Sequence, residues 1–191
     1  MFLDKDGTLI RDVPHNVDPS RIELAPGAGA ALARLREAGF ALVLVSNQPG
    51  VARGCFAEAD LAAVWRRLGE LLAPFGVGLD AIYYCPHDPA GRVRRHAIAC
   101  RCRKPQPGLL KRAAAEHGFA LERSWMIGDI LDDVEAGNRA GCRSVLLDAG
   151  GETEWRAGPW RRPAFVARDL ADAAACILSG EGRGSLTWTQ A

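Results

Sequence analysis

Short apolar runs alternate with amphipathic stretches along this chain, and three of the runs end abruptly in polar side chains. The polar groups that follow them are Asp4 with Asp6, Ser46 with Asn47, and Asp129. Such alternation predicts an α/β fold with a mostly parallel sheet and helices on both faces. Because ligands bind beyond the carboxyl ends of the strands in open sheets of this kind, we expect the three groups to converge on one site.

The same pattern predicts the individual elements. The expected strands cover residues 1–3, 41–45, 79–84, 125–127, 144–147 and 164–166. The expected helices cover residues 26–39, 57–73, 107–118, 131–140 and 170–178. Residues 46–50 indicate a turn-rich loop, and residues 85–106 a long irregular loop. Since no linker divides the chain, we expect one domain over residues 1–178 and a flexible tail over 179–191.

Composition argues against several classes of partner. The 191 residues have a formal charge of +1, so no overall field attracts nucleic acid or an anionic membrane. No apolar run approaches the ~20 residues that a membrane-spanning helix needs. Met1 leads directly into residues 2–4 without the basic and apolar pattern of an export signal. We therefore expect a cytoplasmic, monomeric protein that binds neither nucleic acid nor a membrane.

Asp4 and Asp6 follow the first predicted strand directly. Two carboxylates this close repel each other unless they share a cation or a proton. Hard oxygen ligands suit Mg²⁺, and Asp129 at another strand end could supply a further one. The alternative is a simple turn or helix cap, which many Asp-x-Asp-Gly segments form. Beside such a magnesium site, Ser46 and Lys104 could bind a phosphoryl group, whereas alone they indicate a turn cap and a solvated surface.

Three cysteines and one histidine crowd into a single segment of the chain. These residues are Cys85, His87, Cys100 and Cys102. Three thiolates and an imidazole form a good tetrahedral set for structural zinc, Zn²⁺. Since four ligands leave no open position, zinc here would staple the loop and hold Arg103 and Lys104 over the site rather than catalyse. The alternative is a set of buried free cysteines beside a surface histidine.

The remaining cysteines and histidines lack partners of this kind. Cys55, Cys142 and Cys176 are expected to be small core or surface residues. His96 and His117 lie in basic or helical contexts typical of a surface, and the sequence assigns them no role.

Four motifs follow one another along the chain: Asp-x-Asp-Gly-Thr, Ser46 at a strand end, Lys104-Pro and Gly-Asp129-x-x-x-Asp. Their order resembles the haloacid dehalogenase superfamily of phosphohydrolases. This resemblance spans residues 2–133 and implies a Rossmann-like fold. It implies that Asp4 attacks phosphorus and forms an aspartyl-phosphate, while Asp6 acts first as general acid and then as general base. It also implies that Asp4, the backbone carbonyl of Asp6 and Asp129 hold Mg²⁺, and that Ser46 and Lys104 stabilise the phosphoryl group.

Within that superfamily, Cys-Pro-His-Asp-Pro, Cys-x-Cys-Arg-Lys-Pro and residues 45–54 are similar to the heptose bisphosphate phosphatases. The histidinol-phosphate phosphatases are near relatives whose loop between the two ligand pairs is shorter. The resemblance implies a phosphorylated sugar as substrate and no large cap domain. The substrate contacts that it implies are Asp12, His15, Ser46, Asn47, Gln48, Arg103 and Lys104. Among these, Arg103 would pair with a second phosphate that is not cleaved.

Three residues depart from the pattern of these relatives. His15 stands where an aromatic or another residue is frequent, Pro49 replaces a frequent Ser, and Ile130 replaces a usual Lys. Pro49 removes a hydroxyl and an N–H donor, and Ile130 removes a cation from the phosphate pocket.

A hypothesis from another functional class is a nucleic-acid-binding protein that uses the zinc loop. It rests on the basic residues Arg92, Arg94, Arg95, His96, Arg101, Arg103 and Lys104, and the near-zero net charge argues against it.

Overall fold

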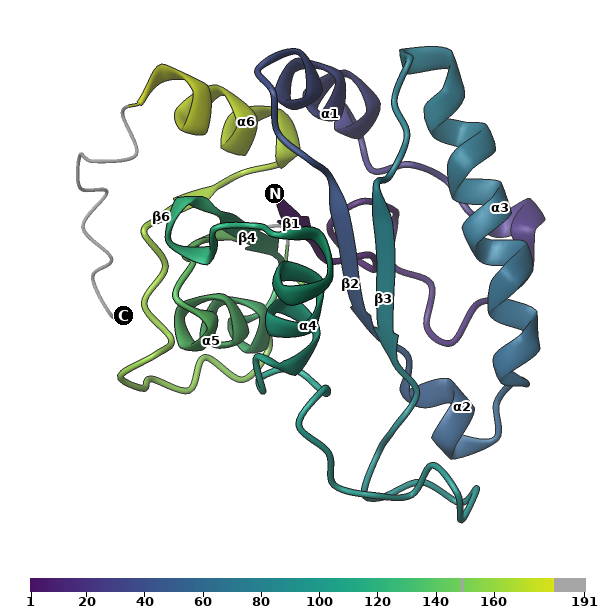
Figure 1. Cartoon of the computed structure of the whole chain (residues 1–191). Helices are drawn as coiled ribbons and strands as arrows, with labels where there is room; N and C mark the ends of the chain where they lie inside the picture. Colours follow the sequence, from purple (N-terminus) through teal and green to yellow (C-terminus); the bar gives the residue numbers. More distant parts are fainter. Residues whose placement is uncertain (149, 181–191) are drawn as a thin grey trace.

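A six-stranded parallel sheet is the framework of the computed structural model, which describes residues 1–148 and 150–180 (Figure 1). The strands follow the order β3-β2-β1-β4-β5-β6. They are β1 (Phe2–Leu3), β2 (Val43–Asn47), β3 (Ala81–Cys85), β4 (Trp125–Gly128), β5 (Arg143–Leu147) and β6 (Phe165–Ala167). Because β1 lies between β2 and β4, the residues that follow it lie at the middle of the sheet's carboxyl edge.

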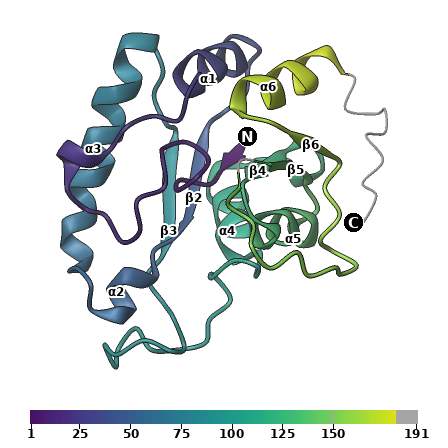
Figure 2. The same ribbon diagram turned by 180° about the vertical axis from the view of Figure 1, so that it is seen from behind.

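Helices cover both faces of this sheet (Figures 1 and 2). They are α1 (Ala28–Glu37), α2 (Pro49–Arg53), α3 (Leu61–Leu72), α4 (Gly108–His117), α5 (Leu131–Ala140) and α6 (Leu170–Ser179). Apolar side chains of α1, α3 and α6 form one buried core with one face of the sheet, and those of α4 and α5 form a second core with the other face. The predicted fold class is therefore confirmed.

Two local expectations were wrong in ways that affect the site. The second strand starts at Val43 and continues to Asn47, because its last residue still pairs with Cys85 of β3. Ser46 and Asn47 consequently belong to the strand itself. The turn-rich loop expected over 46–50 gives way to α2, whose first residue Pro49 has the fixed φ that suits the first turn of a helix.

The remaining segments also bear on the predicted boundaries. Between β1 and β2 the chain forms α1 and the short 3₁₀ turn Pro19–Arg21, as expected for a protein without a large cap domain. Residues 85–106, here called the cysteine loop, lie at the carboxyl ends of β2 and β3 beside α2 (Figure 1). Ser179 still belongs to α6, and residues 181–191 of the predicted tail lie outside the described residues. None of the helices among the described residues has the length and apolarity to cross a bilayer.

Candidate active site

Three buried carboxylates meet at the middle of the sheet's carboxyl edge. Asp4 follows β1, and its backbone N–H donates to the carbonyl oxygen of Ile127 in β4 at 3.0 Å. Asp129 follows β4, and Asp133 lies in the first turn of α5. One carboxylate oxygen of each residue lies within 4.8 Å of the others, so the group could hold a metal ion. Asp4, Asp129 and Asp133 are called the carboxylate cluster below.

The ammonium of Lys104 is inserted into this cluster. Lys104 Nζ lies 2.5 Å from an oxygen of Asp4 and 2.5 Å from an oxygen of Asp133, and it donates to the carbonyl oxygen of Val45 at 3.0 Å. Its side chain is only 2% exposed. Burial alone would lower the pKa of Lys104, but the carboxylates of Asp133 and Asp4 outweigh burial and raise it. The carboxylates of Asp133 and Asp4 thus favour the charged form of Lys104.

One ammonium does not neutralise three carboxylates. Burial, together with the charges of Asp133 and Asp4, raises the pKa of Asp129 to about 8. Burial also raises the pKa of Asp133, although the charge of Lys104 opposes it. Buried carboxylates that hold protons near neutral pH favour a second cation, and their hard oxygen atoms suit a divalent metal ion.

Asp6 lies beside the cluster rather than in it. Its Oδ1 is 3.1 Å from Lys5 Nζ, and its Oδ2 accepts a hydrogen bond from Gln48 Nε2 at 3.2 Å. Burial raises the pKa of Asp6, and the neighbouring ammonium of Lys5 acts in the opposite direction. The side chain is 32% exposed, so it combines a raised pKa with access to the cavity in front of it, as general acid–base catalysis requires.

Two glycines let the backbone pack directly against Asp129. A Cβ atom at Gly7 would lie 2.1 Å from Asp129 Oδ2, and one at Gly151 would lie 2.0 Å from the same atom. Gly7 also has a φ of 75°, which only glycine adopts readily. The loops after β1 and β5 therefore close around this carboxylate.

The cluster opens into a cavity of about 430 Å³. The predicted substrate contacts that line it are Asp12, His15, Asn47, Gln48, Arg103 and Lys104. The two departures Pro49 and Ile130 line it as well. Ser46 is not among the lining residues, because the amide of Gln48 lies over it and donates to Ser46 Oγ at 2.8 Å. The predicted contact from Ser46 is thus the one that this arrangement does not bring to the cavity wall.

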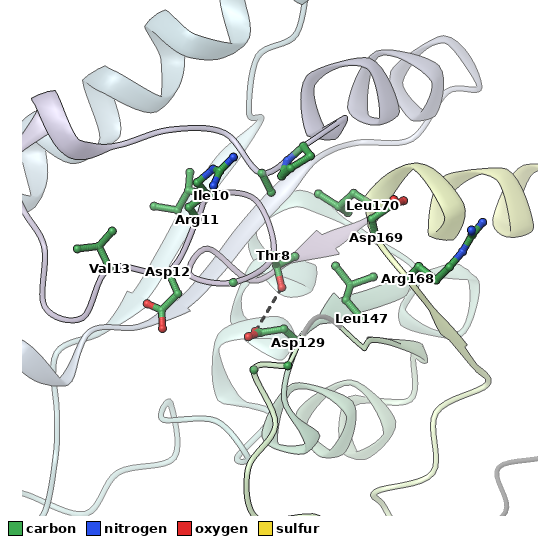
Figure 3. A pocket seen from close by; sticks show the side chains of 15 residues that line it. Thr8, Ile10, Arg11, Asp12, Val13, Asp129, Leu147, Arg168, Asp169 and Leu170 are labelled. Carbon is green, nitrogen blue, oxygen red and sulfur yellow. Dashed lines mark hydrogen bonds between the residues drawn. The ribbon is translucent and has the colours of Figure 1, made fainter.

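A second cavity of about 640 Å³ is also lined by Asp129 (Figure 3). Asp12, Asp129 and Gly151 line both cavities. The hydroxyl of Thr8, which also lines the second cavity, donates to Asp129 Oδ1 at 3.4 Å. Asp129 therefore belongs to the walls of both cavities.

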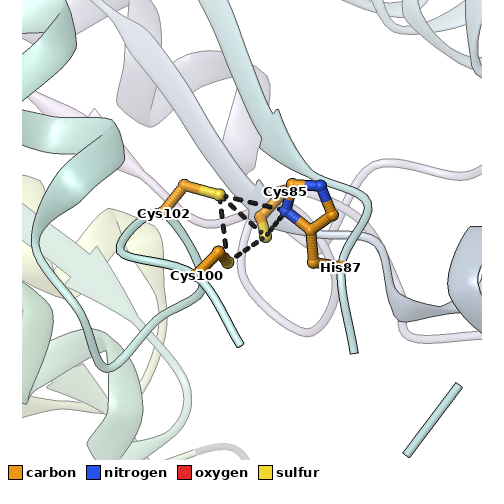
Figure 4. Close-up of side chains that lie close together, drawn as sticks. All are labelled: Cys85, His87, Cys100 and Cys102. Carbon is orange, nitrogen blue, oxygen red and sulfur yellow. Dashed lines mark hydrogen bonds between the residues drawn. The ribbon is translucent and has the colours of Figure 1, made fainter. Parts of the chain in front are cut away.

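The cysteine loop brings its four predicted ligands together (Figure 4). Cys102 Sγ lies 3.2 Å from the sulfur atoms of Cys85 and Cys100, and 3.4 Å from His87 Nδ1. Cys85 and Cys100 are 3.5 Å apart. Four ligands around one zinc ion would be about 3.8 Å apart, given a Zn–S bond of ~2.3 Å. The four side chains consequently have the chemistry and the spacing to hold a metal ion.

Relatives of known sequence decide the family. A family model described as HAD-hydrolase-like matches residues 101–173. The D-glycero-β-D-manno-heptose-1,7-bisphosphate 7-phosphatase of Yersinia pestis is 40% identical over 147 residues, which are 77% of this chain and 78% of the relative. The chain belongs to the haloacid dehalogenase family of phosphatases.

Two further comparisons extend the likeness of this phosphatase to nearly its whole length. The Pasteurella multocida enzyme of the same name is 36% identical over 172 residues, which cover 90% of this chain and 92% of the relative. The crystal structure of the D,D-heptose 1,7-bisphosphate phosphatase of B. bronchiseptica, complexed with magnesium and phosphate, has a TM-score of 0.77 and 33% identity. The match covers 94% of this chain and 98% of that one.

Sequence reasoning missed several residues of the phosphatase site. Asp133 was noted only as the end of a motif, and its place in the cluster follows from its position in the first turn of α5. Arg53 lines the cavity from the end of α2 and contacts Asp88 Oδ2 through Nε and Nη2, both at 2.8 Å. His96 was expected at the surface, but it is buried: its ring packs 5.9 Å from that of His87, and its Nε2 lies 3.7 Å from Glu58.

The side chain of Asn47 joins two segments of the site, the end of β2 and the end of the cysteine loop. Its side-chain nitrogen donates to the carbonyl oxygen of Lys104 at 3.1 Å, and its side-chain oxygen accepts from the backbone N–H of Lys104 at 3.0 Å. Both polar atoms of the amide therefore bind backbone. Asn47 ties the end of the cysteine loop to the end of β2, and so determines where Lys104 enters the cluster.

Proposed function

We propose that this phosphatase releases phosphate from a small phosphorylated sugar through an aspartyl-phosphate on Asp4. The observation that supports it best is the contact between the Asp4 carboxylate and Lys104 Nζ, 2.5 Å long, at one end of an open cavity. A carboxylate oxygen of Asp4 attacks phosphorus while the bond to the sugar oxygen breaks, and Asp6 gives that oxygen its proton. Asp6 then takes a proton from the water that attacks the aspartyl-phosphate, which frees phosphate and restores Asp4.

The cation of Lys104 has two roles in this scheme. Before the reaction its ammonium contacts one carboxylate oxygen of Asp4 and so holds the nucleophile in place. During the reaction its ammonium offsets the negative charge that develops on the phosphoryl oxygens. We keep Ser46 as a proposed donor to the same oxygens, although Gln48 covers its hydroxyl.

We propose Mg²⁺ as the metal ion of the carboxylate cluster. The donors are Asp4, Asp129 and the backbone carbonyl of Asp6, with Asp133 adjacent, and Mg²⁺ prefers oxygen ligands of this kind. When bound, Mg²⁺ would neutralise the phosphoryl oxygens and orient them toward Asp4.

The affinity for Mg²⁺ is expected to rise with pH. Asp129, with its pKa raised to about 8, holds a proton in the metal-free protein at neutral pH, and that proton must leave before the carboxylate binds the metal. The dissociation constant should therefore fall by up to about tenfold per pH unit between about pH 6 and 8, and level off above. Calorimetric titration in two buffers of different ionisation enthalpy measures the released proton. An affinity that is constant over this window would contradict the raised pKa.

We propose Zn²⁺ as the structural ion of the cysteine loop. Removing it with a strong chelator is expected to release the loop, so that trypsin cuts after Arg92, Arg94 or Arg95 before it cuts elsewhere. The KM for substrate should rise, because Arg103 follows the last ligand, while added Mg²⁺ does not restore it. Metal analysis of protein purified without chelators provides the check, and the proposal fails if no zinc is found.

We propose D-glycero-β-D-manno-heptose 1,7-bisphosphate as the substrate and its 7-phosphate as the group removed. The names of the relatives support this substrate. The cavity supports it as well, because the guanidinium groups of Arg53 and Arg103 line the same space as Lys104. Guanidinium groups bind phosphate through paired hydrogen bonds, so the two arginines suit a second phosphate on the same molecule, with Arg103 as the first candidate because Arg53 already pairs with Asp88.

Phosphate release from four compounds tests this proposal. They are the heptose 1,7-bisphosphate, the heptose 7-phosphate, histidinol phosphate and a phosphorylated hexose, each with Mg²⁺. The bisphosphate is expected to react with the highest kcat/KM, and Arg103→Gln should reduce its advantage over the 7-phosphate. Faster release from histidinol phosphate would instead favour the alternative substrate. Light scattering and a gel-shift assay on the same preparation test the predicted monomer and the predicted lack of nucleic-acid binding.

A further inference from the structure

Lys5 is a buried lysine between the two aspartates of the first motif. Its side chain is only 2% exposed, although its neighbours Asp4 and Asp6 face the cavity. Lys5, Lys104 and Lys111 are the only lysines in the sequence, so two of the three contribute ammonium groups to this site. Desolvating an ammonium is costly unless a carboxylate compensates it. A buried Lys5 therefore needs a carboxylate partner.

That partner is the side chain of Asp6. Lys5 Nζ lies 3.1 Å from Asp6 Oδ1, and no other ion pair of Lys5 is found within the described residues. The ammonium also lies over the ring of Trp65 in α3, 5.7 Å from the ring centroid. The ring face of a tryptophan attracts a cation, and more strongly when both are shielded from water. Trp65 therefore gives the Lys5 ammonium a second favourable contact besides Asp6.

The two oxygen atoms of Asp6 are held by different donors. Lys5 Nζ contacts Oδ1, and Gln48 Nε2 donates to Oδ2 at 3.2 Å. A carboxylate held at both oxygens has little freedom to rotate about its Cβ–Cγ bond. Gln48 also donates to Ser46 Oγ at 2.8 Å, so the Oδ2 side is anchored to the end of β2. Among the described residues, Lys5 is the partner found for Oδ1, and the Trp65 ring contacts Lys5 in turn.

We propose that Lys5 is a positioning residue that holds the Asp6 carboxylate, by its ion pair and with the support of the Trp65 ring, in the orientation that reaches the leaving oxygen of the substrate. This inference rests on the proposed function, in which Asp6 protonates that oxygen. Without Lys5, the carboxylate rotates about its bond to Cβ and pivots on the contact with Gln48. Protonation of a sugar leaving group is then impaired, while the Asp4 carboxylate itself stays in place.

The proposal predicts a loss that depends on the leaving group. An alkyl alkoxide such as a sugar oxygen leaves only with a proton, whereas p-nitrophenolate leaves without one. Lys5→Met is therefore expected to lower kcat/KM for the sugar phosphate about 10- to 100-fold, a part of the roughly 100- to 10,000-fold that general acid catalysis supplies. For p-nitrophenyl phosphate the loss should stay below about threefold. The inhibition constant of inorganic phosphate should not change, because the phosphate site is intact.

Matched variants separate positioning from folding. Lys111→Met removes an exposed ammonium on α4 and should leave both substrates unaffected. Lys5→Arg retains a cation and should recover part of the loss with the sugar phosphate. If Lys5→Met does not fold, Trp65→Leu withdraws the support of Lys5 instead and should give the same selectivity on a smaller scale. In an Asp6→Asn background, Lys5→Met should have no further effect on the sugar phosphate.

The positioning role would be overturned by a Lys5 or Trp65 variant that loses kcat/KM equally on the two substrates. This holds provided that the variant unfolds at the same temperature as the parent protein. An additive loss in the Asp6→Asn background would overturn it as well. Failure of the proposed function has a different signature, because the unmodified protein would then release phosphate from neither substrate.

Discussion

Replacing Asp4 with asparagine abolishes phosphate release while the fold stays intact. The amide is too weak a nucleophile to form the phosphoryl bond, and removal of a catalytic nucleophile in other enzymes costs up to about a millionfold in kcat. The side-chain oxygen of asparagine still accepts the hydrogen bond from Lys104 Nζ, so packing changes little. Steady-state phosphate release and thermal unfolding measure the two parts of this expectation.

A trapping experiment makes the test of Asp4 sharper. Acid quenching of the unmodified protein during turnover, followed by mass spectrometry of its peptides, should find a phosphorylated peptide that contains residue 4. The Asp4→Asn protein should give none. Asp172→Asn is the matched control, because it removes a carboxylate on α6 that pairs with Arg168 away from the carboxylate cluster. Normal turnover by Asp4→Asn would rule out the covalent route.

The second large effect is expected for Lys104→Met. This change removes the ammonium between Asp4 and Asp133 and leaves buried carboxylates without their cation. Breaking a buried ion pair in this way typically lowers the free energy of unfolding by about 3–5 kcal/mol. Phosphate release should be lost as well, because nothing then offsets the charge on the phosphoryl oxygens. Urea unfolding and phosphate release measure the two effects.

Conditions that neutralise the carboxylate cluster should rescue the stability of Lys104→Met but not its activity. Lowering the pH protonates Asp129 and Asp133, whose pKa values are raised, so stability should recover toward pH 5.5. Excess Mg²⁺ should act in the same direction. Lys111→Met is the control, since it removes an ammonium that lies at the surface. If Lys104→Met were as stable as this control at pH 8, the cluster would not depend on the buried cation.

The position of the site could be predicted from the sequence because parallel strands end at a common edge. Asp4, Ser46 and Asp129 each follow or end an apolar run, and this alone places them near one another. The spacing of the cysteines likewise indicated a cluster, and the four side chains do meet. These predictions needed only the local pattern and the rule of strand direction. The roles assigned to the residues stay predictions until the variants are measured.

Burial of polar side chains could not be predicted in the same way. His96 stands in a basic segment that indicates a surface, yet it is buried, and its Nε2 lies 3.7 Å from Glu58 in the turn before α3. The burial of Lys5 beside Trp65 of α3 has no signal in the sequence either. Asp133 is similar: its position in a helix was predicted, but not that its carboxylate faces Lys104. Such contacts join residues far apart in sequence, and no local pattern encodes them. The helix that begins at Pro49 was predicted as part of a turn-rich loop, because a helix of only five residues shows no periodic pattern.

The two hydrogen bonds between Asn47 and the backbone of Lys104 have a consequence for how such enzymes diversify. Cys85 is fixed in β3 at one end of the cysteine loop, and Asn47 fixes Lys104 at the other. Lengthening or shortening the loop between these anchors costs little, since loop closure depends only weakly on length. New loops can therefore be tried by mutation without displacing the reactive groups. Substrate selectivity can therefore change through mutations in the cysteine loop while the catalytic residues keep their positions.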